Sequence, residues 1–348
     1  MGFFASIISL AINKGKISET DYRFELEQYN GINNHQVPMR IYYSKKKTNK
    51  TAIMFLGASP DGEEHKSINY LAKILTKFNY NVFIPRIPPL MQLNISNKNV
   101  DWIKYLYELI QKRNDVDSKN ITAIGISYGG GMLLKASLSK KMTKIPPKSI
   151  FLYGSGCNAD TILKFITKGE FDSNGKLAKV MPHDWGLTVF FHHFIDEIDF
   201  GFDSKNIKEV IQYRINNNKE KAKERLEKLE ANEYKIANSI ITGRIIPEVQ
   251  EMVDKLIIIK SDYIEQLSCK PICHLVKPKV FIFHGANDNM VPFTESIQLN
   301  QLIPDSSLLI SYIFEHKGIS NKRSILFKLK EILKLVHFLS RFDKHNAS

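Results

Sequence analysis

The sequence predicts an α/β protein with a mostly parallel central sheet, helices on both faces of the sheet and a long, largely helical insertion. Three observations carry this prediction. Short apolar runs alternate with helical patterns over residues 51–156, the alternation stops over residues 157–267, and it resumes at residue 279. Because strands that alternate with helices form parallel sheets covered on both faces, we expect the middle block to be inserted into a single sheet.

The first part of the chain supplies most of the predicted sheet. Two runs, 22–29 and 37–43, are expected to form an antiparallel pair that opens it. Buried strands are then predicted over 51–57, 81–86, 121–127 and 149–156, and helices over 61–78, 100–113 and from 130 onward. Asp61 and Glu64 have capping-box spacing, and with Glu63 they are interpreted as residues of the helix start.

The predicted domains follow from this order. Residues 1–20 form an N-terminal apolar segment, 21–156 and 268–348 form the core, and 157–267 form the insertion. Within the insertion, 218–235 is expected to be one strongly charged helix. After a strand from 279, a helix over 295–302 and a strand over 308–314, a last helix is predicted. Its expected apolar stripe consists of Ile325, Leu329, Ile332, Val336 and Leu339.

Composition and charge narrow the classes of function. The 348 residues carry a formal net charge of +13, but the lysines are spread along the chain and no nucleic-acid-binding signature occurs. We therefore interpret the charge as surface solvation and expect no nucleic-acid partner. The three cysteines, Cys157, Cys269 and Cys273, are odd in number and include no CxxC, which argues against a disulfide framework or a structural zinc site and favours a reducing, cytoplasmic compartment.

The N-terminal segment leaves two interpretations open. Phe3–Ile12 is almost wholly apolar but shorter than the about 20 residues that span a bilayer, and it lacks the features of a signal peptide. A helix packed on the core is slightly favoured over peripheral contact with a membrane. The sequence does not determine the oligomeric state.

A candidate nucleophile lies at the end of the strand 121–127. Gly125-Ile126-Ser127-Tyr128-Gly129 fits the pattern G-x-S-x-G, in which a serine occupies a sharp turn between a strand and a helix. The glycines allow neighbouring backbone to pass close by, and the helix N-terminus provides free N–H groups. Because a hydroxyl is a weak nucleophile without a base, this serine needs a histidine and an orienting acid.

Two residues that follow later strands match those roles. Asp288 comes after the strand from 279, and His316 comes after the strand 308–314. Each lies just beyond the carboxyl end of a predicted strand, where catalytic groups of open α/β sheets gather. The alternatives are a turn-forming Asp288 and a surface His316. His284 is expected to support the turn before Asp288 rather than to act in catalysis.

With these residues the chain resembles the α/β-hydrolase superfamily. Ser127 matches the nucleophile elbow, Asp288 in the segment 284–292 matches the acid, and His316 matches the late histidine of that family. The resemblance covers about residues 20–156 and 265–342 and implies the α/β-hydrolase fold, with the insertion as a cap. It also implies a serine hydrolase that cleaves a carboxylic ester through an acyl-enzyme intermediate, without a cofactor or metal.

The resemblance is weakest at the oxyanion hole. The family often carries His-Gly after its third strand, whereas this chain has Leu56-Gly57. The backbone N–H groups of Tyr128 and of Ala58, or alternatively of Ser59, are expected to stabilise the oxyanion.

Several alternatives remain at this stage. They are a catalytically inactive binding protein on the same fold, a membrane-associated lipid hydrolase or thioesterase, and a metal site at His183, His192 and His193. Adjacent histidines point to different sides of a helix, which disfavours the metal site.

Overall fold

The central sheet contains eight strands in the order β1-β2-β4-β3-β5-β6-β9-β10. In this computed structural model the described residues are 17–173, 175–197, 201, 203–312, 314–315, 318–319 and 324–347. β1 pairs antiparallel with β2, β2 pairs antiparallel with β4, and every later pair is parallel. The predicted α/β class, the opening antiparallel pair and the mostly parallel sheet are therefore confirmed. The strands are β1 (Tyr22–Asn30), β2 (Gln36–Ser44), β3 (Thr51–Phe55), β4 (Asn81–Pro85), β5 (Ile121–Ile126), β6 (Ser149–Tyr153), β9 (Lys279–Gly285) and β10 (Ser306–Ser311).

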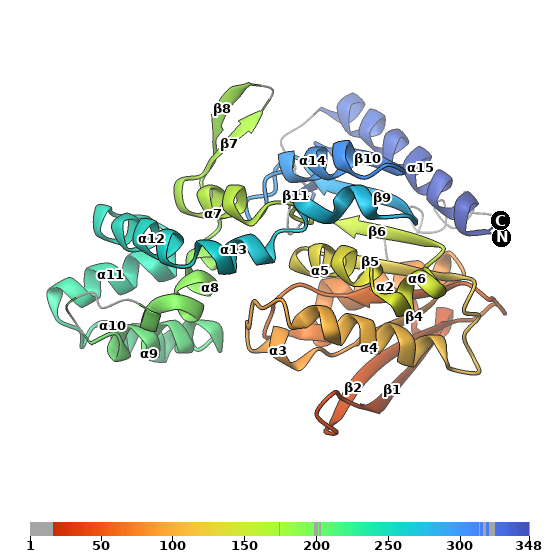
Figure 1. Cartoon of the computed structure of the whole chain (residues 1–348), viewed down its shortest axis with the longest axis horizontal. Helices are drawn as coiled ribbons and strands as arrows, with labels where there is room; N and C mark the ends of the chain where they lie inside the picture. Colours follow the sequence, from red (N-terminus) through yellow and green to blue (C-terminus); the bar gives the residue numbers. More distant parts are fainter. Residues whose placement is uncertain are drawn as a thin grey trace.

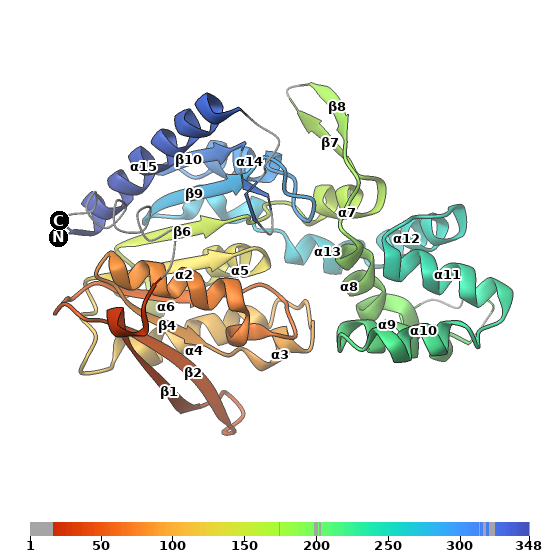
Figure 2. The same cartoon turned by 180° about the vertical axis from the view of Figure 1, so that it is seen from behind.

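Helices cover both faces of this sheet (Figures 1 and 2). One face packs against α4, α5, α6 and α14, and the other packs against α2 and α15. The inner strands read as continuous apolar runs because both faces are covered, and all six residues of β5 are buried. The core helices are α2 (Lys66–Lys77), α3 (Pro88–Met91), α4 (Asn99–Gln111), α5 (Tyr128–Ser137), α6 (Lys140–Lys144), α14 (Thr294–Leu302) and α15 (Ile325–Ala347).

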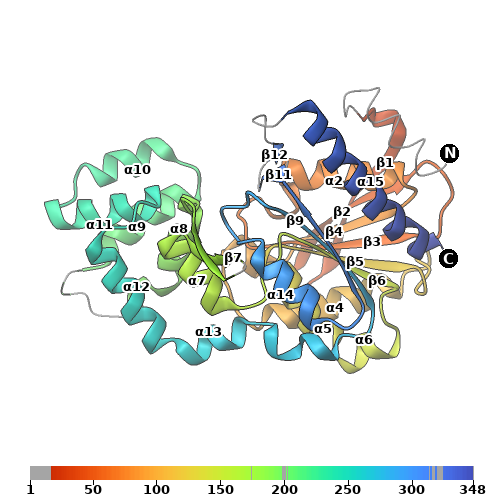
Figure 3. The same ribbon diagram turned by 90° about the horizontal axis from the view of Figure 1, so that it is seen from above.

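Residues 157–267 form a helical segment beyond the carboxyl ends of the parallel strands (Figures 1 and 3). It has its own apolar core, built by α7 to α12. The segment contains α7 (Ala159–Lys168), α8 (Asp184–Phe194), α9 (Lys205–Ile215), α10 (Lys219–Leu226), α11 (Ala231–Thr242), α12 (Pro247–Ile259) and α13 (Ser261–Leu267). A hairpin of β7 (Glu170–Ser173) and β8 (Lys176–Lys179) also occurs, which the sequence analysis did not predict.

Several further elements are only two to six residues long. The 3-10 helices are η1 (Glu19–Asp21), η2 (Gly62–Glu64), η3 (Ile195–Glu197) and η4 (Lys270–Leu275). The two-residue strands β11 (Phe314–Glu315) and β12 (Gly318–Ile319) pair antiparallel. Among the described residues, no helix is both long enough and apolar enough to cross a bilayer. The N-terminal segment 1–16, and with it Phe3–Ile12, lies outside the described residues.

Three local predictions were wrong. The charged stretch 218–235 is two helices, because the first ends at Leu226 and the second begins at Ala231. Asp61 makes no capping hydrogen bond, and α2 begins only at Lys66.

The predicted stripe on the last helix is wrong at Leu329 and Ile332, whereas Leu339 does pack against the sheet core. Leu329 and Ile332 are exposed, and the described buried positions are Glu331, Phe338, Phe342 and Asn346. The large rings of Phe338 and Phe342 pack on Phe281 of β9 and so set the rotation of α15.

Candidate active site

Ser127 lies at the junction between β5 and α5, in a backbone conformation that residues other than glycine rarely adopt. Its φ is 53° and its ψ is −128°. Such a conformation costs a non-glycine residue about 1–3 kcal/mol and persists only where its surroundings impose it. Here the N–H of Ser127 donates to the carbonyl of Tyr153 at 2.8 Å, and its own carbonyl accepts from the N–H of Gly130 at 3.0 Å. The predicted sharp turn between strand and helix is therefore present.

Glycines around Ser127 make room for close backbone contacts. A Cβ on Gly129 would lie 2.4 Å from the carbonyl oxygen of Leu56, and one on Gly125 would lie 2.5 Å from the Cα of Gly130. Gly57, which follows β3, has the same role on the other side. A Cβ there would lie 3.1 Å from the Cβ of Ser127 and 3.4 Å from its Oγ. The loop after β3 therefore packs closely against Ser127.

The two predicted backbone donors, Tyr128 and Ala58, directly follow Ser127 and Gly57 in the chain. Tyr128 is the first residue of α5, where N–H groups have no partner within the helix. Its ring points elsewhere, because the hydroxyl donates to the carbonyl of Ser96 at 2.9 Å, and burial raises the pKa of the phenol. Ala58 directly follows Gly57. The N–H of Ser59, the alternative donor, already donates to the carbonyl of Leu90 at 3.0 Å.

Asp288 lies in the turn after β9 and is buried, with 7% of its surface exposed. Its Oδ1 accepts from the backbone N–H groups of Met290, at 2.8 Å, and of Val291, at 3.0 Å. Its Oδ2 lies 3.4 Å from the position of a Cβ on Gly154, just past β6. Since β6 lies between β5 and β9 and all three strands are parallel, Ser127 and Asp288 both lie at the carboxyl ends of the strands.

His284 supports this turn, as the sequence analysis expected. It is fully buried; its Nδ1 lies 2.6 Å from Oγ of Ser296, and its Nε2 lies 3.0 Å from the carbonyl oxygen of Val291. Its Nε2 is 3.5 Å from Oδ2 of Asp288. Both ring nitrogens therefore have neighbours inside the core, so the imidazole is held away from solvent.

His316 lies outside the described residues, but the chain on its N-terminal side runs beside the Asp288 turn. The N–H of Ala286 donates to the carbonyl of Ser311 at 2.8 Å, and the side-chain amide of Asn287 donates to the carbonyl of Tyr312 at 3.4 Å.

The sequence analysis missed two buried carboxylates near this site. Glu63 is fully buried and accepts from Nε of Arg86 at 2.9 Å through both oxygens, which ties the loop after β3 to β4. Glu295 accepts from the N–H groups of Cys157 and Asn158, both at 2.8 Å. Both were apparent in the sequence only as acidic residues near helix starts, so nothing distinguished them from solvated ones.

The three histidines of the helical segment each contact a different partner. His183 accepts from the N–H of Trp185 at 3.0 Å and caps α8. His192 lies 3.4 Å from the carbonyl oxygen of Gln92, and His193 lies 3.1 Å from the hydroxyl of Tyr263. Among the residues that the structure describes, the only metal-compatible group of at least three ligands is formed by cysteines instead.

Comparison with known proteins identifies the fold. No protein-family model and no curated protein matches the sequence. Among solved structures, the 2,6-dihydroxy-pseudo-oxynicotine hydrolase is similar with a TM-score of 0.50 and 12% identity, over 91% of this chain and 67% of that one. The acylaminoacyl peptidase of Pyrococcus horikoshii is similar with a TM-score of 0.53 and 12% identity, over 94% of this chain and 43% of that one. The chain thus spans less than half the length of the peptidase.

These similarities, with the strand order and the turn at Ser127, show that the chain has the α/β-hydrolase fold. At 12% identity these similarities show the fold alone, and a fold by itself does not determine function.

Proposed function

We propose that the protein is a serine hydrolase that cleaves a carboxylic ester through an acyl-enzyme intermediate. The observation that carries the proposal is the strained conformation of Ser127, with φ at 53°, between a buried strand and a helix N-terminus. Strain of this kind clusters at active sites, where it presents a reactive group. Of the two structural neighbours described above, one is named a hydrolase and the other a peptidase, which supports hydrolysis as the reaction class.

Each residue has a defined role in the proposed reaction. His316 takes the proton of Ser127 as the hydroxyl attacks the ester carbonyl, and then returns it to the leaving alcohol. Asp288 orients the imidazole and stabilises its protonated form. The tetrahedral oxyanion is bound by the N–H groups of Tyr128 and Ala58. The bond between Ser59 and Leu90 supports Ala58 as the second donor, because it occupies the alternative N–H.

We further propose that the helical segment 157–267 acts as a cap over this site. Ala58 packs against both the sheet core and the apolar core of the helical segment. On the Asp288 side, the N–H of His183 donates to the carbonyl of Asn289 at 2.9 Å, and the rings of Phe171 and Phe293 meet at 5.6 Å between centroids. A cap with an aromatic interior favours an ester with an apolar acyl part.

The direct test is labelling with a fluorophosphonate probe, which reacts with activated serines. We expect the wild-type protein to be labelled and Ser127→Ala to be unlabelled. Ser137→Ala is the matched control, because Ser137 lies on the helix that begins after Ser127 and its hydroxyl donates to the carbonyl of Leu134. If the wild type stays unlabelled while a known serine hydrolase reacts, the protein is a binding protein on this fold and the proposal fails.

The substrate class is tested with p-nitrophenyl esters of increasing acyl length and the corresponding anilides. We expect ester cleavage that rises with acyl length and falls by about 10⁴-fold or more in Ser127→Ala. Cleavage of the anilides at rates comparable to those of the esters would instead favour an amidase or a peptidase.

A further inference from the structure

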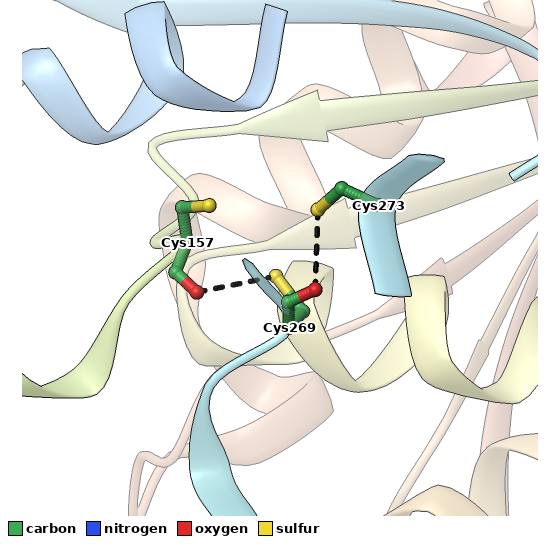
Figure 4. Close-up of side chains that lie close together, drawn as sticks. All are labelled: Cys157, Cys269 and Cys273. Carbon is green, nitrogen blue, oxygen red and sulfur yellow. Dashed lines mark hydrogen bonds between the residues drawn. The ribbon is translucent and has the colours of Figure 1, made fainter. Parts of the chain in front are cut away.

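All three cysteines of the chain meet at one buried point. Cys157 and Cys269 are 112 residues apart in sequence, yet the three sulfur atoms all lie within 4.8 Å of one another (Figure 4). Each residue is at most 1% exposed. Since these are the only cysteines among 348 residues, their convergence concentrates the whole thiol content of the protein in one site.

The cluster lies where the chain leaves the core and where it returns. Cys157 follows β6 at the start of the helical segment, and Cys269 and Cys273 follow α13 on the way to β9. The two crossings are already held together by the backbone, because the N–H groups of Cys269 and Lys270 both donate to the carbonyl of Cys157 at 3.0 Å. The sulfur atoms are therefore positioned by rigid backbone rather than by flexible loops.

We propose that the three thiols form a binding site for one soft cation, Cu(I), in trigonal thiolate coordination. Thiolates select soft ions such as Cu(I). With a metal–sulfur bond of about 2.3 Å, a trigonal site needs sulfur atoms roughly 4 Å apart, which is compatible with the observed cluster.

Coordination number favours Cu(I) over Zn²⁺. A structural zinc site takes four protein ligands, whereas among the described residues no histidine, aspartate, glutamate or further cysteine joins the three sulfur atoms in the cluster.

The present partners of the thiols are easily replaced. Cys269 donates weakly from its Sγ to the carbonyl of Gly156 at 3.5 Å, and Cys273 donates to the carbonyl of Cys269 at 3.2 Å. Thiols that become ligands release their protons to solvent. The carbonyl of Cys269 also accepts from the N–H of Ile272 at 3.0 Å. It therefore still has a hydrogen-bond donor when the Cys273 thiol becomes a metal ligand.

The surroundings connect the cluster to the candidate active site. A Cβ on Gly131 of α5, the helix that begins after Ser127, would lie 3.7 Å from Sγ of Cys269. Lys135 on the same helix also contacts the end of the helical segment, because its ammonium group donates to the carbonyl of Gln266. A bound ion would therefore link the two crossings of the helical segment to each other, beside the helix that begins after Ser127.

The test is an anaerobic titration of the reduced full-length protein with Cu(I) in competition with bicinchoninate. We expect one Cu(I) per chain, three sulfur ligands in the X-ray absorption spectrum, and an affinity at least 100-fold lower in Cys273→Ser. Met132→Leu is the matched control, because it removes the sulfur of another fully buried side chain in the same core and should leave binding unchanged.

Three results would overturn the proposal. One is Cu(I) retention by the wild type no greater than that of the triple variant Cys157→Ala/Cys269→Ala/Cys273→Ala. Another is one-to-one retention of Zn²⁺ without retention of Cu(I). The third is a single free thiol in the unreduced, denatured protein, which would mean a disulfide at this place. Where a substituted variant does not fold, the number of sulfur ligands in the wild type decides alone.

Discussion

At the scale of single residues, the geometry of the candidate site depends on glycines, because a Cβ atom at these positions would clash with neighbouring backbone. The turn at Ser127 is closed by main-chain contacts that a methyl group would block, above all at Gly129, whose position faces the carbonyls of Phe55 and Leu56. The same contacts set the distance between the loop after β3 and the serine. The geometry proposed for the oxyanion hole therefore depends on this glycine as much as on the residues that react.

Gly129→Ala should damage the site far more than its neighbour Gly131→Ala. The new Cβ at residue 129 would lie within 2.5 Å of two carbonyl oxygens, whereas at residue 131 its nearest contact is 3.6 Å. We expect Gly129→Ala to cost about 1–3 kcal/mol or more of unfolding free energy and to abolish probe labelling. Gly131→Ala should be neutral or stabilise the helix by about 1 kcal/mol. Urea denaturation and labelling measure both effects, and equal behaviour of the two variants would contradict the argument.

Sequence reasoning works well for residues whose chemistry is local. G-x-S-x-G is a contiguous pattern, so the strand, the sharp turn and the helix around Ser127 were predictable from five letters. The convergence of the cysteines was not, because the position of Cys157 beside Cys269 depends on how the helical segment returns to the sheet. For the same reason the burial of Glu63 was missed, since its partner Arg86 lies just beyond the end of β4.

At the scale of elements, the loop between β3 and α2 contains an ion pair whose acidic partner, Glu63, is fully buried. The Glu63 side chain is 0% exposed, whereas that of Arg86 is 25% exposed, and the hydrogen bond to Glu63 raises the pKa of the guanidinium. Loss of Arg86 should therefore cost more stability than loss of Glu63. A lone Arg86 can turn toward solvent, but a lone Glu63 carboxylate cannot.

This asymmetry predicts the ranking of three variants. Arg86→Met should lose about 3–5 kcal/mol, because an uncompensated charge stays buried. Glu63→Met should lose about 1 kcal/mol or less, and the double variant should regain most of the loss of Arg86→Met. Chemical denaturation of the four proteins gives the coupling energy. A larger loss in Glu63→Met than in Arg86→Met would refute the account.

The helix α8 should respond to pH through its two adjacent histidines. Burial lowers the pKa of His192 and of His193. A histidine with a depressed pKa in the folded state contributes stability that is complete above about pH 6.5 and declines as the pH falls below that value, because the unfolded chain binds the proton more readily. The charged groups that act on them are Lys208 for His192, and His192, Glu197 and Lys260 for His193.

We therefore expect the melting temperature to fall between pH 7.5 and pH 5.5, and the fall to be smaller in His192→Gln/His193→Gln. His337→Gln is the matched control, because His337 is exposed on α15. Scanning calorimetry at both pH values makes the comparison. The same fall in the double variant as in the wild type would assign the pH dependence to other groups.

The strands of the sheet were easier to predict from the sequence than the helix boundaries of the helical segment. The buried strands were predicted because both of their faces are apolar over five or six residues. Within the helical segment the patterns are weaker. The break between α10 and α11 lies in Glu227–Glu230, where the composition remains that of a helix. The face of α15 was misjudged because the bulk of Phe338 and Phe342 determined its packing rather than the number of aliphatic residues.

At the scale of the whole molecule, the buried apolar side chains form two core systems. The sheet and its helices form one core system, and α7 to α12 form the other. Leu93, in the chain between α3 and α4, is fully buried but belongs to the core of the helical segment. Leu90, three residues earlier, belongs to the core of the sheet. This short stretch therefore anchors the helical segment on the α/β-hydrolase core, close to Ala58.

Truncation of these two leucines should separate the two cores experimentally. Each cavity should cost about 2–5 kcal/mol, but in different places. Leu93→Ala should speed amide hydrogen exchange in α8 and α11 and leave β5 and β9 protected, whereas Leu90→Ala should speed exchange in the elements packed on the sheet. Exchange measured on peptides by mass spectrometry resolves the two patterns. If Leu93→Ala speeds exchange equally in β5 and in α8, the two cores unfold as one cooperative unit, and the helical segment cannot open over Ser127 while the sheet stays folded.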